Sequence, residues 1–233
     1  AFINELADFC EIANADVQEV AKGMGLDKRI GSKFLHAGPG YGGSCFPKDT
    51  AALAQSAQDF QCNLSIVDAV IESNDRRKQN MVKKIINALG GTVANKKLAV
   101  LGLTFKPNTD DMRESPSLDI IPGLQNAGAS ISAYDPEGMK EAEQLFKEVE
   151  FKNDPYETMT DADAVVIITE WNVFRALDLE RVKSLLKKPK MVDLRNIYTL
   201  KEMQNAGFDY TSIGRTQKAK SVLCSVESEK MAG

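Results

Sequence analysis

The chain has 233 residues, which at roughly 150 residues per domain corresponds to one large domain, or to one domain and part of another. Hydrophobic residues make up 43% and charged residues 27%, as in an ordinary soluble globular chain, and 16 glycines and 8 prolines are too few for a collagen-like or low-complexity sequence. With 29 basic and 33 acidic residues the net charge is −4, which argues against a general nucleic-acid-binding protein but leaves room for a local basic pocket.

The ends and the cysteines narrow the class of protein further. No stretch approaches the ~20 apolar residues of a membrane helix, and the first residues carry no secretory signal. The chain starts without Met inside a predicted helix, so we expect it to be part of a longer protein. Its four cysteines form no Cys-x-x-Cys pair and its single histidine has no ligand spacing around it, so we expect reduced cytoplasmic thiols and no metal site.

Helical spacing dominates residues 1–95. Apolar residues recur at intervals of three and four over 2–13, and Asp16 is placed to cap a short helix over 17–24. Further helices are predicted over 48–60 and, much longer, over 64–89, where two glycines end the pattern. A helix of that length often spans two domains or packs in a subunit interface.

After residue 95 the pattern changes to short apolar runs that alternate with helical stretches. The runs cover residues 97–103, 130–134, 163–169 and 190–194. They predict a parallel sheet covered on both faces, so residues 96–215 are expected to form a doubly wound α/β, Rossmann-like domain. Ligands of such domains bind beyond the carboxyl ends of the strands. The polar, aperiodic residues 216–233 are predicted to be a disordered tail.

The densest chemical signal is the run GPGYGGSCFPKD at residues 38–49. Four glycines in six residues let the backbone approach a ligand closely and expose amide N–H groups. Cys45 precedes a helix whose start is marked by Pro47, so the helix dipole and Lys48 both favour its nucleophilic thiolate. Asp49, one turn further along, is placed to handle a proton or to orient a water.

The alternative interpretation of this run is a structural cysteine beside a glycine-rich turn, but the glycines together with the helix start favour a functional Cys45. Cys10 is expected in the core, Cys62 in a helix–helix connection and Cys224 in the tail. His36 adjoins the run, and a partly exposed histidine is favoured over a catalytic base.

A second candidate region, LGLTFKPNTDDMRES at residues 101–115, follows the first predicted strand. It is not G-x-G-x-x-G, so the usual dinucleotide fingerprint is absent there. Lys106 and Arg113 are well placed for phosphate or carboxylate, although a solvated charge run is equally compatible with the spacing. Arg195, at the end of the last strong strand, is predicted to point at the same crevice. Trp171 is expected to pack in the core or to stack on a base.

Together these segments resemble the nucleotide-sugar dehydrogenase family, and the run at 38–45 is most similar to its UDP-glucose branch. The matching stretches are GLDKRIGSK (25–33), GPGYGGSCFPKD (38–49), GLTFKPNTDDMRES (102–115), YDP (134–136) and DLRN (193–196). The resemblance implies a helical dimerisation region over 1–95, a UDP-sugar-binding domain over 96–215 and a homodimer or higher oligomer. It further implies NAD-dependent oxidation of UDP-glucose to UDP-glucuronate at C6, and no nucleic-acid or membrane partner.

The resemblance also implies roles for individual residues. Cys45 matches the nucleophile that would form a thiohemiacetal and then a thioester, and Asp49 matches the carboxylate that assists the hydrolytic water. Arg113 matches a contact to NAD, and Arg29 matches an arginine that reaches the substrate of the neighbouring subunit. The remaining matches to substrate contacts are Phe34, Leu35, Tyr41, Gly42, Gly43, Phe105, Lys106 and Arg195.

Several parts of the family pattern have no counterpart here: the NAD-binding domain, a catalytic Lys, a catalytic Glu and a substrate-binding Asn. We therefore expect a central and C-terminal portion that is inactive alone, and that binds UDP-sugar weakly and dimerises. Three alternatives stay open. One is a non-catalytic UDP-sugar-binding and dimerisation module, another is a sibling dehydrogenase of GDP-mannose or a UDP-N-acetylhexosamine, and the third is a thiol hydrolase using Cys45 and His36.

Overall fold

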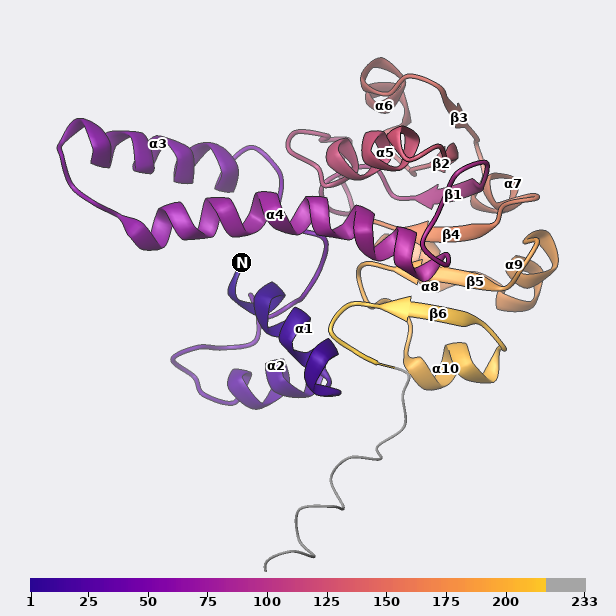
Figure 1. Cartoon of the computed structure of the whole chain (residues 1–233), viewed down its shortest axis with the longest axis horizontal. Helices are drawn as coiled ribbons and strands as arrows, with labels where there is room; N and C mark the ends of the chain where they lie inside the picture. The colour runs from indigo at the N-terminus through magenta and orange to yellow at the C-terminus, as the bar shows by residue number, and fades with distance from the viewer. Residues whose placement is uncertain (217–233) are drawn as a thin grey trace, which may run out of the picture.

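Four helices dominate the first part of the computed structural model, which describes residues 1–216 (Figure 1). They are α1 (Phe2–Ala13), α2 (Val17–Gly25), α3 (Phe46–Asp59) and α4 (Ser65–Ala88). The predicted helices are thereby confirmed close to their expected ends. The carboxylate of Asp16 accepts a hydrogen bond from the backbone N–H of Gln18 at 2.8 Å, so the predicted N-cap of α2 is confirmed as well.

A six-stranded parallel sheet forms the second part. Its strands are β1 (Lys97–Leu101), β2 (Ser130–Tyr134), β3 (Val149–Phe151), β4 (Ala164–Ile167), β5 (Lys190–Asp193) and β6 (Asp209–Ser212), in the order β3-β2-β1-β4-β5-β6. Leu98 of β1 pairs with Ile131 on one side and with Ala164 on the other. The strand order reverses between β1 and β4, so their carboxyl ends flank the topological switch point of the sheet.

Helices cover both faces of this sheet. They are α5 (Ser117–Asn126), α6 (Met139–Leu145), α7 (Pro155–Met159), α8 (Asn172–Arg175), α9 (Leu179–Leu185) and α10 (Leu200–Asn205). Alternate residues of β1 enter two separate hydrophobic clusters: Leu98 and Val100 pack with α4 and α5, whereas Ala99 and Leu101 pack on the side of α7 to α10. The predicted doubly wound, Rossmann-like α/β fold is therefore confirmed.

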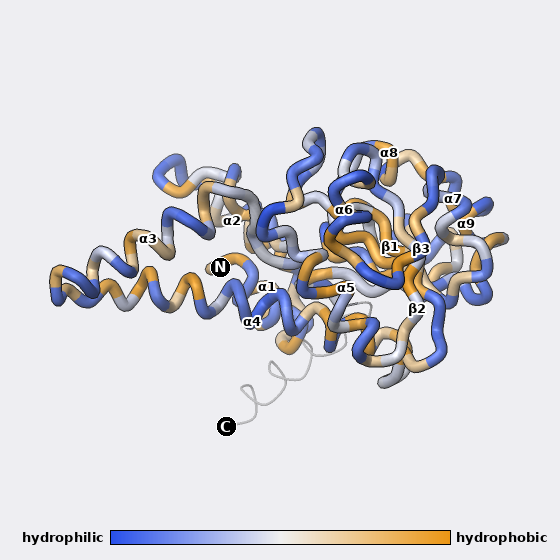
Figure 2. Tube along the Cα trace, turned by 90° about the horizontal axis from the view of Figure 1, so that it is seen from above, coloured by the Kyte–Doolittle hydropathy of each residue, from blue (hydrophilic) through white to orange (hydrophobic). Residues whose placement is uncertain are grey.

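The long helix α4 connects the two parts. At its carboxyl end Met81 and Ile85 are buried in the same hydrophobic cluster as β1, while at its other end α3 and α4 project together from the body of the molecule (Figure 2). The hydrophobic core is thus continuous across residue 95, and the division into units 1–95 and 96–215 stays a prediction. Residues 217–233, most of the predicted tail, lie outside the described residues, as does Cys224.

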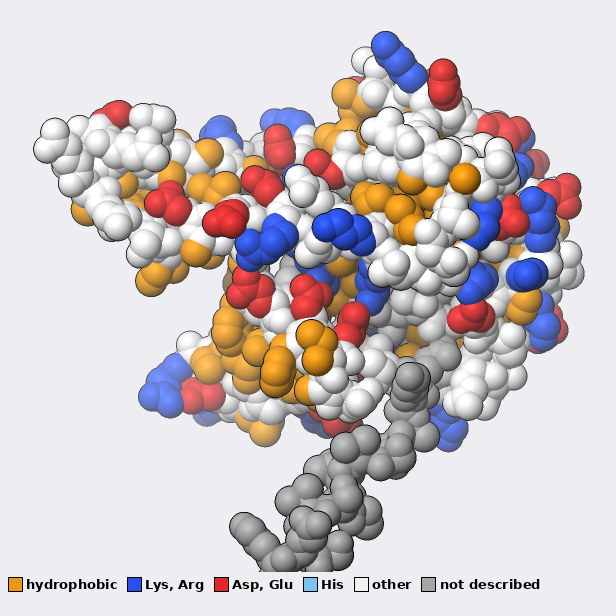
Figure 3. All heavy atoms as spheres, in the orientation of Figure 1, with side chains coloured by type: hydrophobic (Ala, Val, Ile, Leu, Met, Phe, Trp, Pro, Cys, Tyr) orange, Lys and Arg blue, Asp and Glu red, His pale blue; other side chains and the backbone are white. Residues whose placement is uncertain are grey.

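The projection formed by α3 and α4 buries little of its apolar surface. Ala57 is the buried residue of α3, whereas Phe46, Leu53 and Phe60 recur every seven residues and are exposed. Hydrophobic side chains also gather on the surface over α1, where Phe9 is exposed (Figure 3). Within residues 1–216, none of the helices has the length and apolar character to span a membrane.

Candidate functional site

A buried carboxylate organises the loop that follows β1. Asp135, at the end of β2, is fully buried and accepts hydrogen bonds from the N–H groups of Leu103 at 2.6 Å and Thr104 at 3.1 Å, and from Trp171 Nε1 at 3.1 Å. Residues 102–115, here called the switch loop, therefore start from a fixed point at the carboxyl edge of the sheet. Trp171 is buried and donates into this network, so its predicted place in the core is confirmed.

Arg195 is held at the same edge by a second buried carboxylate. The Asp193 carboxylate accepts hydrogen bonds from the backbone N–H of Arg195 at 2.9 Å and from the Tyr210 hydroxyl at 2.7 Å. Burial raises the pKa of Asp193. Arg195 Nε donates to the carbonyl of Ile168 at 2.8 Å, just beyond β4, and the side chain pairs with Glu170 at 3.0 Å. The guanidinium thus lies in the crevice between β4 and β1, where the sequence predicted it.

The glycine-rich run packs directly on the switch loop. Gly43 donates its N–H to the carbonyl of Arg113 at 2.8 Å. A Cβ on Gly42 would overlap the backbone carbonyl of Glu114, and one on Gly43, whose φ is +86°, would lie 2.7 Å from the Phe105 ring. The glycines are therefore required because protein backbone and an aromatic ring occupy the space that a side chain would take.

The candidate nucleophile lies where this run meets α3. Cys45 is exposed and is the N-cap residue of α3, with Pro47 in the first turn, as predicted. The Asp49 N–H donates to the Cys45 carbonyl at 2.8 Å, and both side chains line one cavity of about 290 Å³ together with Phe46, Thr50 and Leu53. The structure therefore brings the predicted nucleophile and the predicted water-assisting carboxylate into one cavity.

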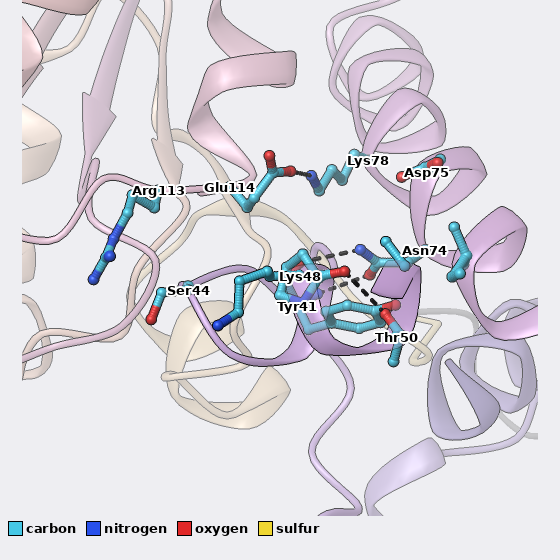
Figure 4. A pocket seen from close by; sticks show the side chains of 13 residues that line it. Tyr41, Ser44, Lys48, Thr50, Asn74, Asp75, Lys78, Arg113 and Glu114 are labelled. Carbon is cyan, nitrogen blue, oxygen red and sulfur yellow. Dashed lines mark hydrogen bonds and ion pairs between the residues drawn. The ribbon is translucent and has the colours of Figure 1, made fainter. Parts of the chain in front are cut away.

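A larger cavity of about 510 Å³ lies between α3, α4, the glycine-rich run and the switch loop, and Arg113 lies on its wall (Figure 4). Two side-chain hydrogen bonds to Asp111, of 2.9 and 2.7 Å, hold this guanidinium and keep the pKa of Asp111 below its usual range. The same contact raises the pKa of Arg113, and the nearby Cys45 adds to that effect. Arg113 is thus a fixed cation close to the candidate nucleophile.

Lys106 and Leu35 are two further predicted substrate contacts. Lys106 is exposed and its Nζ lies 5.2 Å from the centroid of the Phe105 ring. Leu35 is half-buried and lines a separate cavity of about 330 Å³ together with Arg195.

Arg29 and Phe34 are not brought to the candidate nucleophile within this chain. The Arg29 side chain is 89% exposed and pairs with Asp27 at 2.6 Å, and Phe34 is 81% exposed. His36 lines the 330 Å³ cavity, whereas Cys45 lines another, so the geometry does not provide the Cys–His pair of a thiol hydrolase.

The polar side chains of α4 that hold the glycine-rich run are not among the predicted site residues. Asn74 exchanges two hydrogen bonds with the backbone of Tyr41, and Arg77 donates to the carbonyl of Gly38 at 2.9 Å. These contacts join residues 33 and 39 positions apart, and no local pattern signals them. The only sequence signal is an unbroken polar run, ESNDRRKQN at residues 72–80, in an otherwise amphipathic helix.

The described residues offer NAD one contact and not a dinucleotide-binding unit. Arg113 is an oriented cation on a cavity wall, which fits a pyrophosphate oxygen. Gly38, Gly40 and Gly43 have the literal spacing G-x-G-x-x-G, but no strand leads into them, as the fingerprint requires. In the described part of the chain no group of three or more His, Cys, Asp or Glu side chains is arranged to hold a metal ion.

Comparison with known proteins agrees with this geometry. Residues 1–76 match the central domain of the UDP-glucose/GDP-mannose dehydrogenase family, and residues 99–200 match its UDP binding domain. The chain is 58% identical over 214 residues to a UDP-glucose 6-dehydrogenase of Rhizobium meliloti, covering 92% of this chain and 49% of that protein. The UDP-glucose 6-dehydrogenase TuaD of Bacillus subtilis is 49% identical, with 92% and 47% covered.

Comparison with solved structures also finds a UDP-glucose dehydrogenase. A UDP-glucose dehydrogenase from the archaeon Pyrobaculum islandicum superposes with a TM-score of 0.80 at 32% identity, covering 92% of this chain and 47% of the other. The chain spans about half the length of the curated relatives that it matches. The two family domains follow one another along it, and the chain belongs to the UDP-glucose/GDP-mannose dehydrogenase family.

Proposed function

We propose that the protein to which these residues belong oxidises the C6 hydroxyl of UDP-glucose to the carboxylate of UDP-glucuronate, with Cys45 as the nucleophile. The observation that carries the proposal is the contact between the glycine-rich run and the switch loop. The Gly43 N–H donates to the Arg113 carbonyl, so the thiol at the start of α3 is tied to the carboxyl edge of the sheet. A ligand held at that edge by its diphosphate can thereby present its sugar to the thiol.

In the proposed chemistry Cys45 is the nucleophile and Asp49 is the base that assists water. After the C6 alcohol has lost a proton and a hydride, the Cys45 thiolate adds to the aldehyde carbon and forms a thiohemiacetal. Loss of a second hydride leaves a thioester on Cys45, and water then attacks the carbonyl, releasing the carboxylate and the thiol. Asp49, which lines the same cavity, accepts the proton of that water.

Cations at the sheet edge and residues of the glycine-rich run would hold the nucleotide sugar. Lys106 and Arg195 lie at the carboxyl edge of the sheet and would supply charge for the diphosphate, with Phe105 beside them. Phe34, Leu35, Tyr41, Gly42 and Gly43 would contact the sugar and diphosphate. NAD, when bound, supplies the hydride acceptor for both oxidations, and Arg113 would contact it.

We further propose that the protein works as a homodimer or a higher oligomer. The α3–α4 projection exposes Phe46, Leu53 and Phe60, and Arg29 extends into solvent away from the site of its own chain. Both features support a subunit contact in which Arg29 reaches the neighbouring site.

A relative of known structure is an NDP-N-acetyl-D-galactosaminuronic acid dehydrogenase from Methanosarcina mazei, with a TM-score of 0.81 at 29% identity, so a sibling sugar is the second candidate substrate.

The test is an assay of the whole protein for NADH formation with UDP-glucose, GDP-mannose and UDP-N-acetylglucosamine. We expect two NADH per UDP-glucose and little turnover of the other two. Cys45→Ala is expected to abolish turnover while UDP-glucose binding persists. Saturable binding of UDP-glucose with no NADH from any of the three sugars would contradict the enzyme proposal and favour a binding and dimerisation module.

A further inference from the structure

One turn of α4 carries four buried polar residues for which the proposed chemistry has no use. Ser73, Asn74, Arg77 and Lys78 all face inward, although α4 is otherwise half-exposed. Burying an amide, a guanidinium and an ammonium group costs free energy unless each finds partners. Asn74, Arg77 and Lys78 all find partners in the two loops of the candidate site. Arg77 also pairs with Asp8 of α1.

Asn74 and Arg77 hold the glycine-rich run. The Asn74 side chain pairs with the backbone of Tyr41 as a neighbouring strand would, accepting from its N–H at 2.8 Å and donating to its carbonyl at 3.1 Å. Arg77 Nε donates to the carbonyl of Gly38 at 2.9 Å. Gly40 lies so close to α4 that an added Cβ would be 3.1 Å from both Asn74 and Lys78, so the run is pressed against the helix.

Lys78, on the same turn, extends to the switch loop. Its Nζ lies 3.5 Å from a carboxylate oxygen of Glu114 and 3.3 Å from one of Asp119, in the first turn of α5. Figure 4 shows Asn74 and Lys78 leaving α4 for Tyr41 and Glu114 respectively, on the wall of the 510 Å³ cavity. A single helical turn therefore contacts both loops.

We infer that Asn74, Arg77 and Lys78 are positioning residues that fix the glycine-rich run, and with it Cys45, relative to the switch loop. This inference rests on the proposed function. An α-helix is rigid over one turn, so the three side chains give both loops a common support and set the separation between the sugar-binding backbone and the UDP-binding edge. None of the three needs to touch the substrate.

The test compares UDP with UDP-glucose, because in the proposed site the cations of the sheet edge would hold most of UDP, whereas the glucose would depend on the glycine-rich run. In calorimetric titrations of the 233-residue chain, Asn74→Ala and Arg77→Ala are expected to leave the Kd for UDP within about twofold. The same variants should weaken UDP-glucose about tenfold, as the loss of one or two supporting hydrogen bonds implies. In the whole enzyme kcat should fall while KM for NAD is unchanged.

Matched variants separate positioning from general destabilisation. Arg76→Ala removes an exposed arginine from the same turn, where it pairs with Glu72 at 3.1 Å, and should change neither affinity. Lys78→Arg keeps both ion pairs and should behave as the unaltered chain, whereas Lys78→Ala should not. Asn74→Asp keeps the acceptor for the Tyr41 N–H but loses the donor, and should resemble Asn74→Ala.

Two outcomes would overturn the inference. If the unaltered chain binds UDP-glucose more tightly than UDP and Asn74→Ala and Arg77→Ala keep that difference, positioning by α4 is wrong although the proposed function stands. If the affinities for UDP and UDP-glucose fall in parallel in these variants, the residues serve general stability alone. Absence of NADH formation from UDP-glucose by the whole enzyme, with UDP-glucose still bound, would overturn the proposed function and this inference with it.

Discussion

The two parts of the molecule hold their functional residues by different means. In the sheet part the loops of the site start from β1, β4 and β5, whose residues are mostly buried, and two buried carboxylates, Asp135 and Asp193, anchor the loop backbone. In the helical part the run that carries Cys45 has no regular secondary structure. It is held by side chains of α4, by Asn4 of α1 and by the switch loop. The α3 helix that follows it buries Ala57 and leaves three large apolar residues in solvent.

Packing therefore stabilises the sheet part, whereas a few contacts set the position of the Cys45 run. The sheet part is packed on both faces, by α7 to α10 on one side and by α4 and α5 on the other, so packing keeps its shape. The Cys45 run depends on a few polar contacts and on glycines that fit against the switch loop, so its position can be altered without unfolding the sheet. Substitutions in the two parts should therefore separate stability from substrate recognition.

The largest effect on stability is expected from Asp193→Ala. The substitution leaves the backbone N–H groups of Arg195, Ile197 and Tyr198 without the buried carboxylate that accepts from them. We expect a loss of roughly 3–5 kcal/mol in the free energy of unfolding, measured by urea denaturation. Asp209→Ala, which removes an exposed partner of Lys190 one strand away, should cost about 1 kcal/mol or less. Equal costs for the two would contradict the anchoring role of Asp193.

Gly42→Ala, in contrast, should weaken the binding of UDP-glucose more than it destabilises the sheet. Its Cβ would overlap the backbone of Glu114, which cannot move aside as a flexible side chain would, so the run must lift from the switch loop. We expect about 2 kcal/mol of destabilisation and a UDP-glucose Kd raised by tenfold or more, with the Kd for UDP little changed. Gly23→Ala, inside α2 with nothing within 4 Å of an added Cβ, should instead stabilise by about 0.5–1 kcal/mol.

The smallest effect concerns pH and the Asp111–Arg113 pair. The pKa of Asp111 is lowered in the folded chain, so the pair contributes stability above the ordinary aspartate range and loses it as the pH falls through the folded pKa. Because the Arg113 side chain is 68% exposed, solvent screens the pair and the contribution should be small. The difference in unfolding free energy between the unaltered chain and Asp111→Asn should shrink on acidification, and a difference that grew instead would give the wrong sign.

Local patterns predicted much of the fold. The four helices of the first part and strands β1, β2, β4 and β5 follow from apolar spacing, because each has an amphipathic face or a buried run. The strands β3 and β6 were missed, since VEF and DYTS are short and carry polar residues at the sheet edges. Helices α6 to α10 were missed for a similar reason, each being seven residues or fewer.

The candidate site was predicted unevenly. The place of Cys45 before α3 follows from Pro47 and the glycines, and that of Arg195 follows from the strand that precedes it. The roles of Arg29, Phe34 and Leu35 rest on the family resemblance and stay predictions. The support of the Cys45 run by Asn74 was out of reach, because pairing between residues 33 positions apart depends on how α4 packs on the sheet.

Whether the two parts form a single UDP-sugar site can be measured on the 233-residue chain by alkylation. Cys45 and Cys62 are both exposed, and they lie at opposite ends of α3. With iodoacetamide and mass spectrometry, millimolar UDP-glucose should slow the labelling of Cys45 at least fivefold and leave that of Cys62 unchanged. Labelling of Cys45 at the same rate with and without UDP-glucose, in a chain that binds the ligand, would contradict a shared site.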